Sequence, residues 1–195
     1  NRRFLVAAHA HRPNLTIDTR AVADTETNQT PFFSSDVSSG ISGLSAFHES
    51  HVQRQTVDVT TLGSALPGYG VTEVSFLKID TEGHDLLVLQ GLDWATIKPS
   101  VIVCEFEDRK TLPIGYSTAH LFSFLEEQGY EVCISEWWPI EKYGESHTWR
   151  RFTPDIGSVG SSAWGNLIAF RTEDRLNGLS IEALERAFKA PRGGS

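Results

Sequence analysis

The segment between residues 74 and 106 constrains the fold most, because it has the pattern of a buried strand, a helix and a second buried strand. Residues 74–80 (VSFLKID) and 100–106 (SVIVCEF) are short, nearly continuous apolar runs, which are typical of strands covered on both faces. Gly83 interrupts the first run, and residues 84–92 (HDLLVLQGL) carry helix-forming leucines, with Gly91 as the predicted C-cap. The pattern therefore predicts an α/β sheet with these two strands adjacent, parallel and central.

Further strands and helices are predicted on either side of this segment. Ser117 predicts the start of a helix over 118–128 that turns Leu121, Phe122 and Leu125 inward. The other regular elements expected are a helix over 3–12, a strand over about 15–23, a half-buried or edge strand over 52–60, strands over 130–137 and 166–171, and a final helix from Ser180 through Phe188. Less periodic segments predict a hairpin and an exposed loop (24–51), a short turn (62–70) and a long ordered connection (138–165). We expect one domain over 1–172, followed by a C-terminal helix and tail over 173–195.

Composition excludes several classes of protein. With 195 residues, 39% of them hydrophobic, the chain can bury a core without disulfides or metal. Its net charge of −8 and its lack of a basic block argue against a nucleic-acid partner, and no 18-residue apolar stretch predicts a membrane span. Cys104 and Cys133 lie in apolar runs, which favours buried thiols and a cytoplasmic location. The chain begins at Asn1 and contains no Met, so we expect its natural start to lie upstream.

Acidic residues gather where the two central strands are expected to end. Residues 80–84 (Asp-Thr-Glu-Gly-His) follow the first strand, and Glu105, Glu107 and Asp108 end the second. Ligands of open α/β sheets bind at the carboxyl ends of strands, so both groups are predicted to face one crevice. A carboxylate whose pKa is raised by burial or by neighbouring like charge can accept a proton from a substrate hydroxyl. The sequence thus makes a carboxylate of this group, beside His84, a candidate general base.

Two other interpretations of the same residues remain open. Asp80 and Glu82 could simply cap the following helix through its backbone N–H groups. The spacing Asp80-x-Glu82-x-His84 also permits a metal-dependent hydrolase, although catalytic metal sites usually have better-defined ligand sets, so we predict no metal. The remaining histidines have no catalytic spacing: His9, His11, His48, His51, His120 and His147.

Several stretches resemble one family of enzymes. The run 74–94 (VSFLKIDTEGHDLLVLQGLDW), followed by 98–107 (KPSVIVCEFE) and 164–171 (WGNLIAFR), is similar to the FkbM family of S-adenosylmethionine-dependent methyltransferases. Lys78 to Asp85 match the signature around the family's fourth strand. Weaker similarity in 15–24 (LTIDTRAVAD) and 57–66 (VDVTTLGSAL) extends the resemblance upstream.

The resemblance implies a fold, a cofactor and roles for individual residues. The fold would be the Rossmann-like class I methyltransferase fold, a seven-stranded sheet flanked by helices. The cofactor would be S-adenosylmethionine, and the partner would be a small-molecule or carbohydrate acceptor methylated on a hydroxyl oxygen. Asp80 would act as base, Glu82 and His84 would orient the acceptor, and Glu105 and Glu107 would line its site. Asp24 and Asp80 would contact the cofactor.

One part of the family pattern is absent. Family members carry an Asp-x-Gly-x-x-x-Gly type loop after their first strand and an acid after the second, and no glycine here follows a buried strand in that way. The first two strands of a class I sheet lie between the third and the fourth. We therefore expect 15–23 and 74–80 either to be separated by a gap that upstream chain fills or to pair directly, and we expect weak cofactor binding by residues 1–195. A catalytically inactive scaffold or interaction domain is the alternative function.

Overall fold

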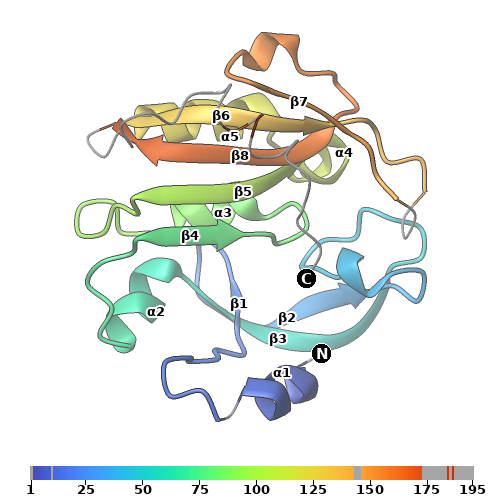
Figure 1. The fold of residues 1–195 in the computed structure, drawn as a ribbon. Coiled ribbons are helices and arrows are strands. Elements are labelled where there is room, and N and C mark those ends of the chain that lie inside the picture. The colour runs from blue at the N-terminus through green and yellow to red at the C-terminus, as the bar shows by residue number, and fades with distance from the viewer. Residues whose placement is uncertain (1, 10, 143–145, 173–183, 185, 187–195) are drawn as a thin grey trace, which may run out of the picture.

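The computed structural model describes residues 2–9, 11–142, 146–172, 184 and 186, which form two sheets and several helices (Figure 1). The larger sheet has the order β4 (Phe76–Ile79), β5 (Val101–Glu107), β8 (Trp164–Arg171), β6 (Tyr130–Trp137) and β7 (Trp149–Thr153). The smaller sheet has the order β1 (Ala21–Val22), β3 (Val52–Thr60) and β2 (Thr27–Ser34). The α-helices are α1 (Arg2–His9), α2 (Leu62–Gly68), α3 (Asp85–Gln90), α4 (Asp108–Thr111) and α5 (Thr118–Glu127). Short 3₁₀ turns are η1 (Ser39–Ile41), η2 (Leu112–Ile114) and η3 (Ile156–Ser158).

The strand–helix–strand unit predicted from residues 74–106 is present. β4 and β5 are adjacent and parallel, with Phe76 opposite Val101 and Ile79 opposite Cys104. Helix α3 connects them, and Gly91 is its C-cap as predicted. The right-handed crossover expected for parallel strands requires such a connection. This unit brings the ends of β4 and β5 to the same edge of the sheet.

The core lies between the larger sheet and the helices α3 and α5, which cover one of its faces (Figure 1). Ser117 caps α5 by accepting a hydrogen bond from the His120 N–H, and the His120 side chain completes a capping box. The inward residues predicted for this helix are buried. Members of the core that are 0% exposed come from α3, α5 and three strands: Leu89, Ile102, Cys104, Leu121, Leu125, Ile134, Leu167 and Ala169.

The prediction that residues 74–80 form a central strand buried on both faces is wrong. β4 lies at the edge of the five-stranded sheet, and no strand pairs with its outer side among the described residues. Phe76 is consequently 60% exposed. β1 pairs with β3 rather than with β4, so 15–23 and 74–80 do not pair directly. An apolar run identifies a strand but does not show whether both of its neighbours are present.

Three predictions about the smaller sheet need correction. The strand expected over 15–23 is limited to Ala21–Val22, which pairs only with the end of β3. β3 has the predicted bounds of 52–60. Of the two alternatives predicted for it, half-buried or edge, the edge position is wrong, because β3 is the middle strand of its sheet. The hairpin expected within 24–51 is reduced to one antiparallel bridge between Phe33 and Gly43, and β2 pairs with β3 instead. The loop between β2 and β3 is not simply exposed, since Ile41 is only 3% exposed.

Besides the four-residue helix α4, two longer elements were not anticipated. The predicted turn over 62–70 is instead largely helix α2, whose N-cap Thr61 accepts a hydrogen bond from the Ser64 N–H. The connection 138–165 contains β7, because Arg150 and Arg151 of this strand each bond the buried Glu136 carboxylate on β6 at 2.7 Å. Neither element has the apolar periodicity that sequence reasoning depends on.

Other expectations are confirmed or fall outside the described residues. Cys104 and Cys133 are buried free thiols. Among the described residues, no helix is long and apolar enough to cross a membrane. The final helix predicted from Ser180 falls on residues of which only Leu184 and Arg186 are described, both in helical conformation.

Close backbone contacts join the two sheets at the end of α3. A Cβ atom on Gly91 would lie 2.3 Å from the carbonyl oxygen of Ala23, so only glycine allows this approach. The Gly63 N–H at the start of α2 donates a hydrogen bond to the Gly91 carbonyl at 2.8 Å. These contacts hold the end of β1, and with it Asp24, beside the helix that follows β4.

Candidate active site

The turn between β4 and α3 has a backbone conformation that requires glycine. Glu82 and Gly83 both have positive φ, of 56° and 99°. A Cβ atom on Gly83 would lie 2.9 Å from the Cβ of Lys110 on α4. The glycine therefore allows the turn to pack directly against the helix that follows β5.

Two buried side chains hold this turn in place. The Asp85 carboxylate, 1% exposed, accepts hydrogen bonds from the Thr81 hydroxyl at 2.9 Å and from the Glu105 N–H at 2.8 Å. Tyr116 donates its hydroxyl to the Gly83 carbonyl at 2.7 Å. Burial raises the pKa of the Asp85 carboxyl, and the hydrogen bonds from Thr81 and Glu105 oppose that rise. The end of β4 is thereby fixed to the end of β5.

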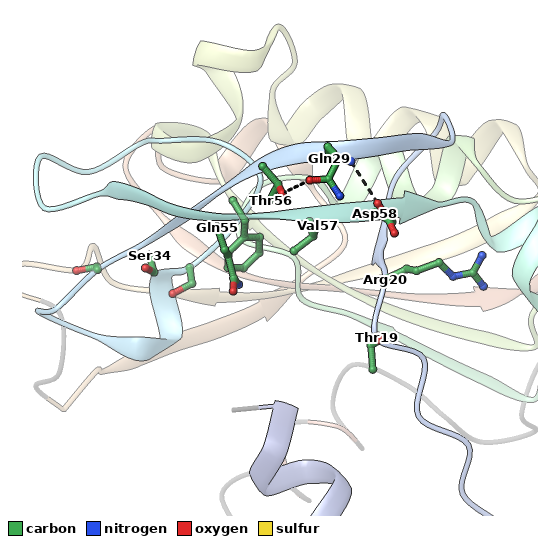
Figure 2. Close-up of a pocket in the computed structure, with 11 residues that line it drawn as sticks. Thr19, Arg20, Gln29, Ser34, Gln55, Thr56, Val57 and Asp58 are labelled. Carbon is green, nitrogen blue, oxygen red and sulfur yellow. Dashed lines mark hydrogen bonds between the residues drawn. The ribbon is translucent and has the colours of Figure 1, made fainter.

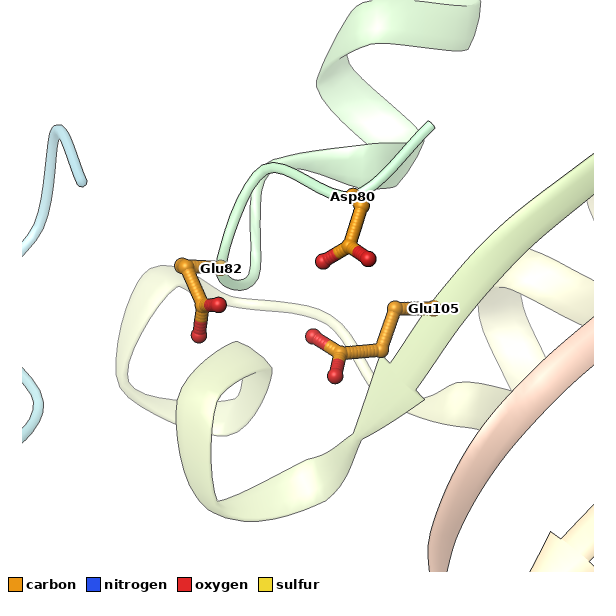
Figure 3. A group of neighbouring side chains, drawn as sticks. All are labelled: Asp80, Glu82 and Glu105. Atoms are coloured by element: carbon orange, nitrogen blue, oxygen red, sulfur yellow. The ribbon is translucent and has the colours of Figure 1, made fainter. Parts of the chain in front are cut away.

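Three carboxylates meet at this edge of the sheet, as predicted (Figure 3). Asp80 and Glu82 extend from the turn, and Glu105 extends from β5. One oxygen of each lies within 4.8 Å of the others. The side chain of Asp80 is 52% exposed, and its carboxylate accepts a hydrogen bond from the Lys78 ammonium at 3.2 Å. Asp80 is thus the member of this carboxylate cluster most open to solvent.

Lys110 is the central cation of the site, and sequence reasoning missed it. Its Nζ lies 2.7 Å from a Glu82 oxygen, 2.8 Å from a Glu105 oxygen and 3.2 Å from a Glu107 oxygen. The Lys110 side chain is only 3% exposed. Glu107 also pairs with the Arg109 guanidinium at 3.0 Å. One buried ammonium therefore holds three carboxylates that come from the turn and from β5.

Burial and like charge shift the pKa values of these groups. Burial raises the pKa of Glu105 to about 7, and Glu82 adds to the rise, although Lys110 opposes it. The pKa of Glu82 is also raised, mainly by burial. For Lys110, burial lowers the pKa, but the carboxylates of Glu105 and Glu82 outweigh it and raise the pKa overall. Perturbed pKa values of this kind cluster at functional sites.

The geometry bears on both alternative interpretations of Asp80 and Glu82. The N-cap of α3 is His84, without a side-chain cap bond, and Asp80 and Glu82 instead contact Lys78 and Lys110. Helix capping is therefore not their role. As oxygen ligands, Asp80, Glu82 and Glu105 could hold a divalent cation, but the ammonium of Lys110 already contacts two of the three. His84 does not belong to this group, which removes the ligand set proposed for a metal-dependent hydrolase.

His84 and Asp24 lie close enough to interact. His84 is 7% exposed, and burial lowers the pKa of its imidazole, while the negative charge of Asp24 opposes that shift. Asp24 itself is exposed at the end of β1. The structure thus brings these two predicted site residues, from different sheets, to one neighbourhood.

Of two cavities on the protein surface, one lies away from the carboxylates and one lies beside them. A cavity of about 740 Å³ lies on the smaller sheet (Figure 2). Three of its polar residues are hydrogen-bonded to one another: Thr56 donates to the Gln29 side chain at 2.7 Å, and the Gln29 N–H donates to Asp58 at 3.2 Å. The second, of about 410 Å³, lies at the carboxyl end of β5, where Glu107 and Leu112 contribute to its walls. Only the second cavity adjoins residues held by Lys110.

The fold and the site together define a class of protein. The carboxyl ends of two parallel strands in an α/β sheet carry buried carboxylates with shifted pKa values, next to a cavity. This arrangement is typical of enzymes that act on small molecules. The family model of the methyltransferase FkbM domain matches residues 6–132. The chain therefore belongs to that methyltransferase family. No curated protein and no solved structure matches the chain.

Proposed function

We propose that the protein transfers a methyl group from S-adenosylmethionine to a hydroxyl oxygen of a small molecule or sugar. The observation that carries this proposal is the meeting of Asp80, Glu82 and Glu105 at the carboxyl ends of β4 and β5, in a chain of a methyltransferase family. S-adenosylmethionine would supply the electrophilic methyl group. We further propose that the two sheets correspond to parts of a Rossmann-like class I domain.

Methyl transfer requires little covalent chemistry from the protein. Holding the acceptor oxygen in line with the methyl group supplies much of the rate enhancement, and a base removes the hydroxyl proton as the new bond forms. Asp80 fits the role of base because its carboxylate is the exposed one in the cluster. Glu82 and Glu105 are held by Lys110, so they would shape the site and orient the acceptor rather than move freely.

The cofactor and the acceptor would occupy different sides of this cluster. Asp24 and Asp80 are exposed carboxylates that follow β1 and β4, and they would hold polar groups of the cofactor. The acceptor would enter the cavity of about 410 Å³ beside Glu107, which has apolar walls from Leu112, Ile140 and Ala163. Pockets for small molecules generally combine such walls with a few polar groups.

A labelled-methyl assay tests the proposal. The natural full-length protein is incubated with methyl-labelled S-adenosylmethionine and a panel of hydroxylated small molecules, including sugars. We expect label to appear in an acid-stable methyl ether of at least one acceptor. Label found only on nitrogen or carbon acceptors would contradict O-methylation. Failure to bind S-adenosylhomocysteine would favour the inactive scaffold instead.

A further inference from the structure

The connection between β6 and β7 carries an exposed indole ring beside the cavity of about 410 Å³, which we call the acceptor cavity. Trp138 directly follows β6 and is 50% exposed. Pro139 and Ile140, the next two residues, line the acceptor cavity. Leu112, which is 60% exposed, lines it as well. Large apolar side chains are therefore exposed both in this cavity and next to it, which is typical of a surface that a ligand covers.

A further cavity, of about 300 Å³, lies on the other side of Pro139. We call it the tryptophan cavity, and its walls are Trp138, Pro139, Glu141, Lys142, Ser146, His147 and Thr148. Pro139 belongs to the walls of both cavities. The two cavities are therefore neighbours, and one extended molecule can occupy both.

Trp138 is held in place before any ligand binds. The guanidinium carbon of Arg150 lies 4.5 Å from the centroid of the Trp138 ring. Arg150 is itself paired with the buried carboxylate of Glu136 at 2.7 Å. The Trp164 Nε1 donates a hydrogen bond to the Trp138 carbonyl at 2.9 Å. A ring that is already ordered offers a flat binding surface at little entropic cost.

Polar side chains of both signs surround these apolar surfaces. Glu107, Asp108 and Arg109 line the acceptor cavity, and Glu141 and Lys142 line the tryptophan cavity. The acidic groups outnumber the basic ones, so the charge does not favour a phosphate or carboxylate ligand. An apolar ligand that displaced water from these groups would leave them without hydrogen bonds, which is unfavourable. The walls therefore suit a neutral molecule with many hydroxyl groups.

We propose that the methyl acceptor is a saccharide of at least two rings, and that Trp138 binds the ring next to the one that is methylated. Sugar hydroxyls both donate and accept hydrogen bonds, which matches the mixed charges of the walls. The C–H groups of a sugar ring carry positive hydrogens, and the face of an indole ring is negative, so the two stack favourably. The methylated ring occupies the acceptor cavity, as in the proposed function on which this inference rests, and the next ring occupies the tryptophan cavity.

An array of immobilised monosaccharides, disaccharides and longer saccharides tests the size of the ligand. The full-length protein, loaded with S-adenosylhomocysteine, is applied to the array. We expect retention on one or more saccharides of at least two rings, and about tenfold weaker retention on the matching monosaccharide. Equal retention on the two, or retention on no saccharide, overturns the proposal.

Substitution of Trp138 tests its role in methyl transfer to a saccharide that the array identifies. Trp138→Ala should raise KM about tenfold with little change in kcat, because the indole binds a ring that does not react. KM for the matching monosaccharide should stay the same, and Trp138→Phe, which keeps an aromatic ring, should retain most of the affinity. Tyr69→Ala is the matched control, since Tyr69 is 48% exposed and lines neither cavity. An unchanged KM in Trp138→Ala overturns the proposal.

Binding of S-adenosylhomocysteine separates these outcomes from misfolding and from failure of the proposed function. Trp138→Ala should bind it as the wild type does, because alanine keeps the carbonyl that Trp164 contacts. If Trp138→Ala does not fold, Trp138→Phe and Trp138→Leu allow the same comparison, since only phenylalanine keeps a ring. Methyl transfer only to hydroxyl groups of molecules other than saccharides would overturn this inference alone. Absence of binding by the wild type would overturn the proposed function as well.

Discussion

At the scale of single residues, the site depends on a lysine surrounded by acids. Sequence reasoning could place Asp80, Glu82 and Glu105 together, because the carboxyl ends of adjacent parallel strands meet at one edge. It could not find Lys110, whose partners are 3, 5 and 28 residues away and whose importance comes from its burial. Contacts of this kind follow from packing rather than from local pattern.

Removing the Lys110 ammonium should destabilise the fold strongly. Lys110→Met leaves Glu82, Glu105 and Glu107 buried without their shared cation, and breaking a buried ion pair in this way typically costs about 3–5 kcal/mol. Urea unfolding at pH 8 measures the loss. Lys78→Met is the matched control, since Lys78 is 39% exposed and its pair with Asp80 should contribute about 1 kcal/mol or less. Equal losses in the two variants would contradict the central role of Lys110.

The raised pKa of Glu105 predicts a pH dependence of stability. The folded state keeps this proton up to about pH 7, whereas an unperturbed Glu releases it near 4.5. The folded state therefore binds more protons between these values, and the free energy of unfolding falls as pH rises through that window, by at most about 3 kcal/mol.

Glu105→Gln should remove this contribution. We expect the difference in unfolding free energy between wild type and Glu105→Gln to fall from pH 4.5 to pH 7.5, as measured by urea titration at several pH values. Glu127→Gln, at an exposed position of α5, should keep the wild-type slope. A pH-independent difference for Glu105→Gln would show that this carboxyl ionises normally.

At the scale of elements, the sequence predicts what has a strong apolar pattern. The bounds of β6 and β3 were predicted to the residue, and those of β5 and α5 to within one residue, because buried or alternating side chains mark them. Helix α2 and strand β7 were missed because a cap and an arginine–glutamate network stabilise them instead. The contact between α3 and β1 was equally hidden, since it depends on how closely two backbones approach.

Substitution of Gly91 tests that contact. Gly91→Ala would place a methyl group 2.3 Å from the Ala23 carbonyl oxygen, so the backbone must shift. We expect a loss of about 1–3 kcal/mol in unfolding free energy, typical of overpacking. Gly68→Ala at the end of α2 is the control, because nothing lies within 4 Å of the added methyl group and its effect should be neutral or slightly stabilising. Equal stability of both variants would show that α3 and β1 do not depend on this approach.

At the scale of the whole molecule, the outer edge of β4 is the main departure from the expected sheet. An edge strand exposes unpaired N–H and C=O groups, and Phe76 adds exposed apolar surface beside them. A class I sheet continues at this position with its first two strands. The sequence alone could not show that β4 is an edge, because its apolar pattern resembles that of a central strand.

At this scale we predict how tightly residues 1–195 bind S-adenosylmethionine. The glycine loop that would let the protein backbone approach the cofactor is not found in the sequence of residues 1–195. Calorimetric titration of this chain with S-adenosylmethionine should therefore give weak or undetectable binding. A micromolar dissociation constant would contradict the prediction and would mean that residues 1–195 suffice to bind the cofactor.

The role of Asp80 is the central claim, and one variant of the full-length protein tests it most directly. Asp80→Asn keeps the size of the side chain but cannot accept the proton, and general-base assistance is typically worth 10²–10⁴-fold, or about 3–5 kcal/mol of barrier. We predict a loss of methyl transfer on that scale, with little change in melting temperature because Asp80 is half exposed. A lower melting temperature with near-normal turnover per folded molecule would make Asp80 structural, and no change in either quantity would exclude it from both roles.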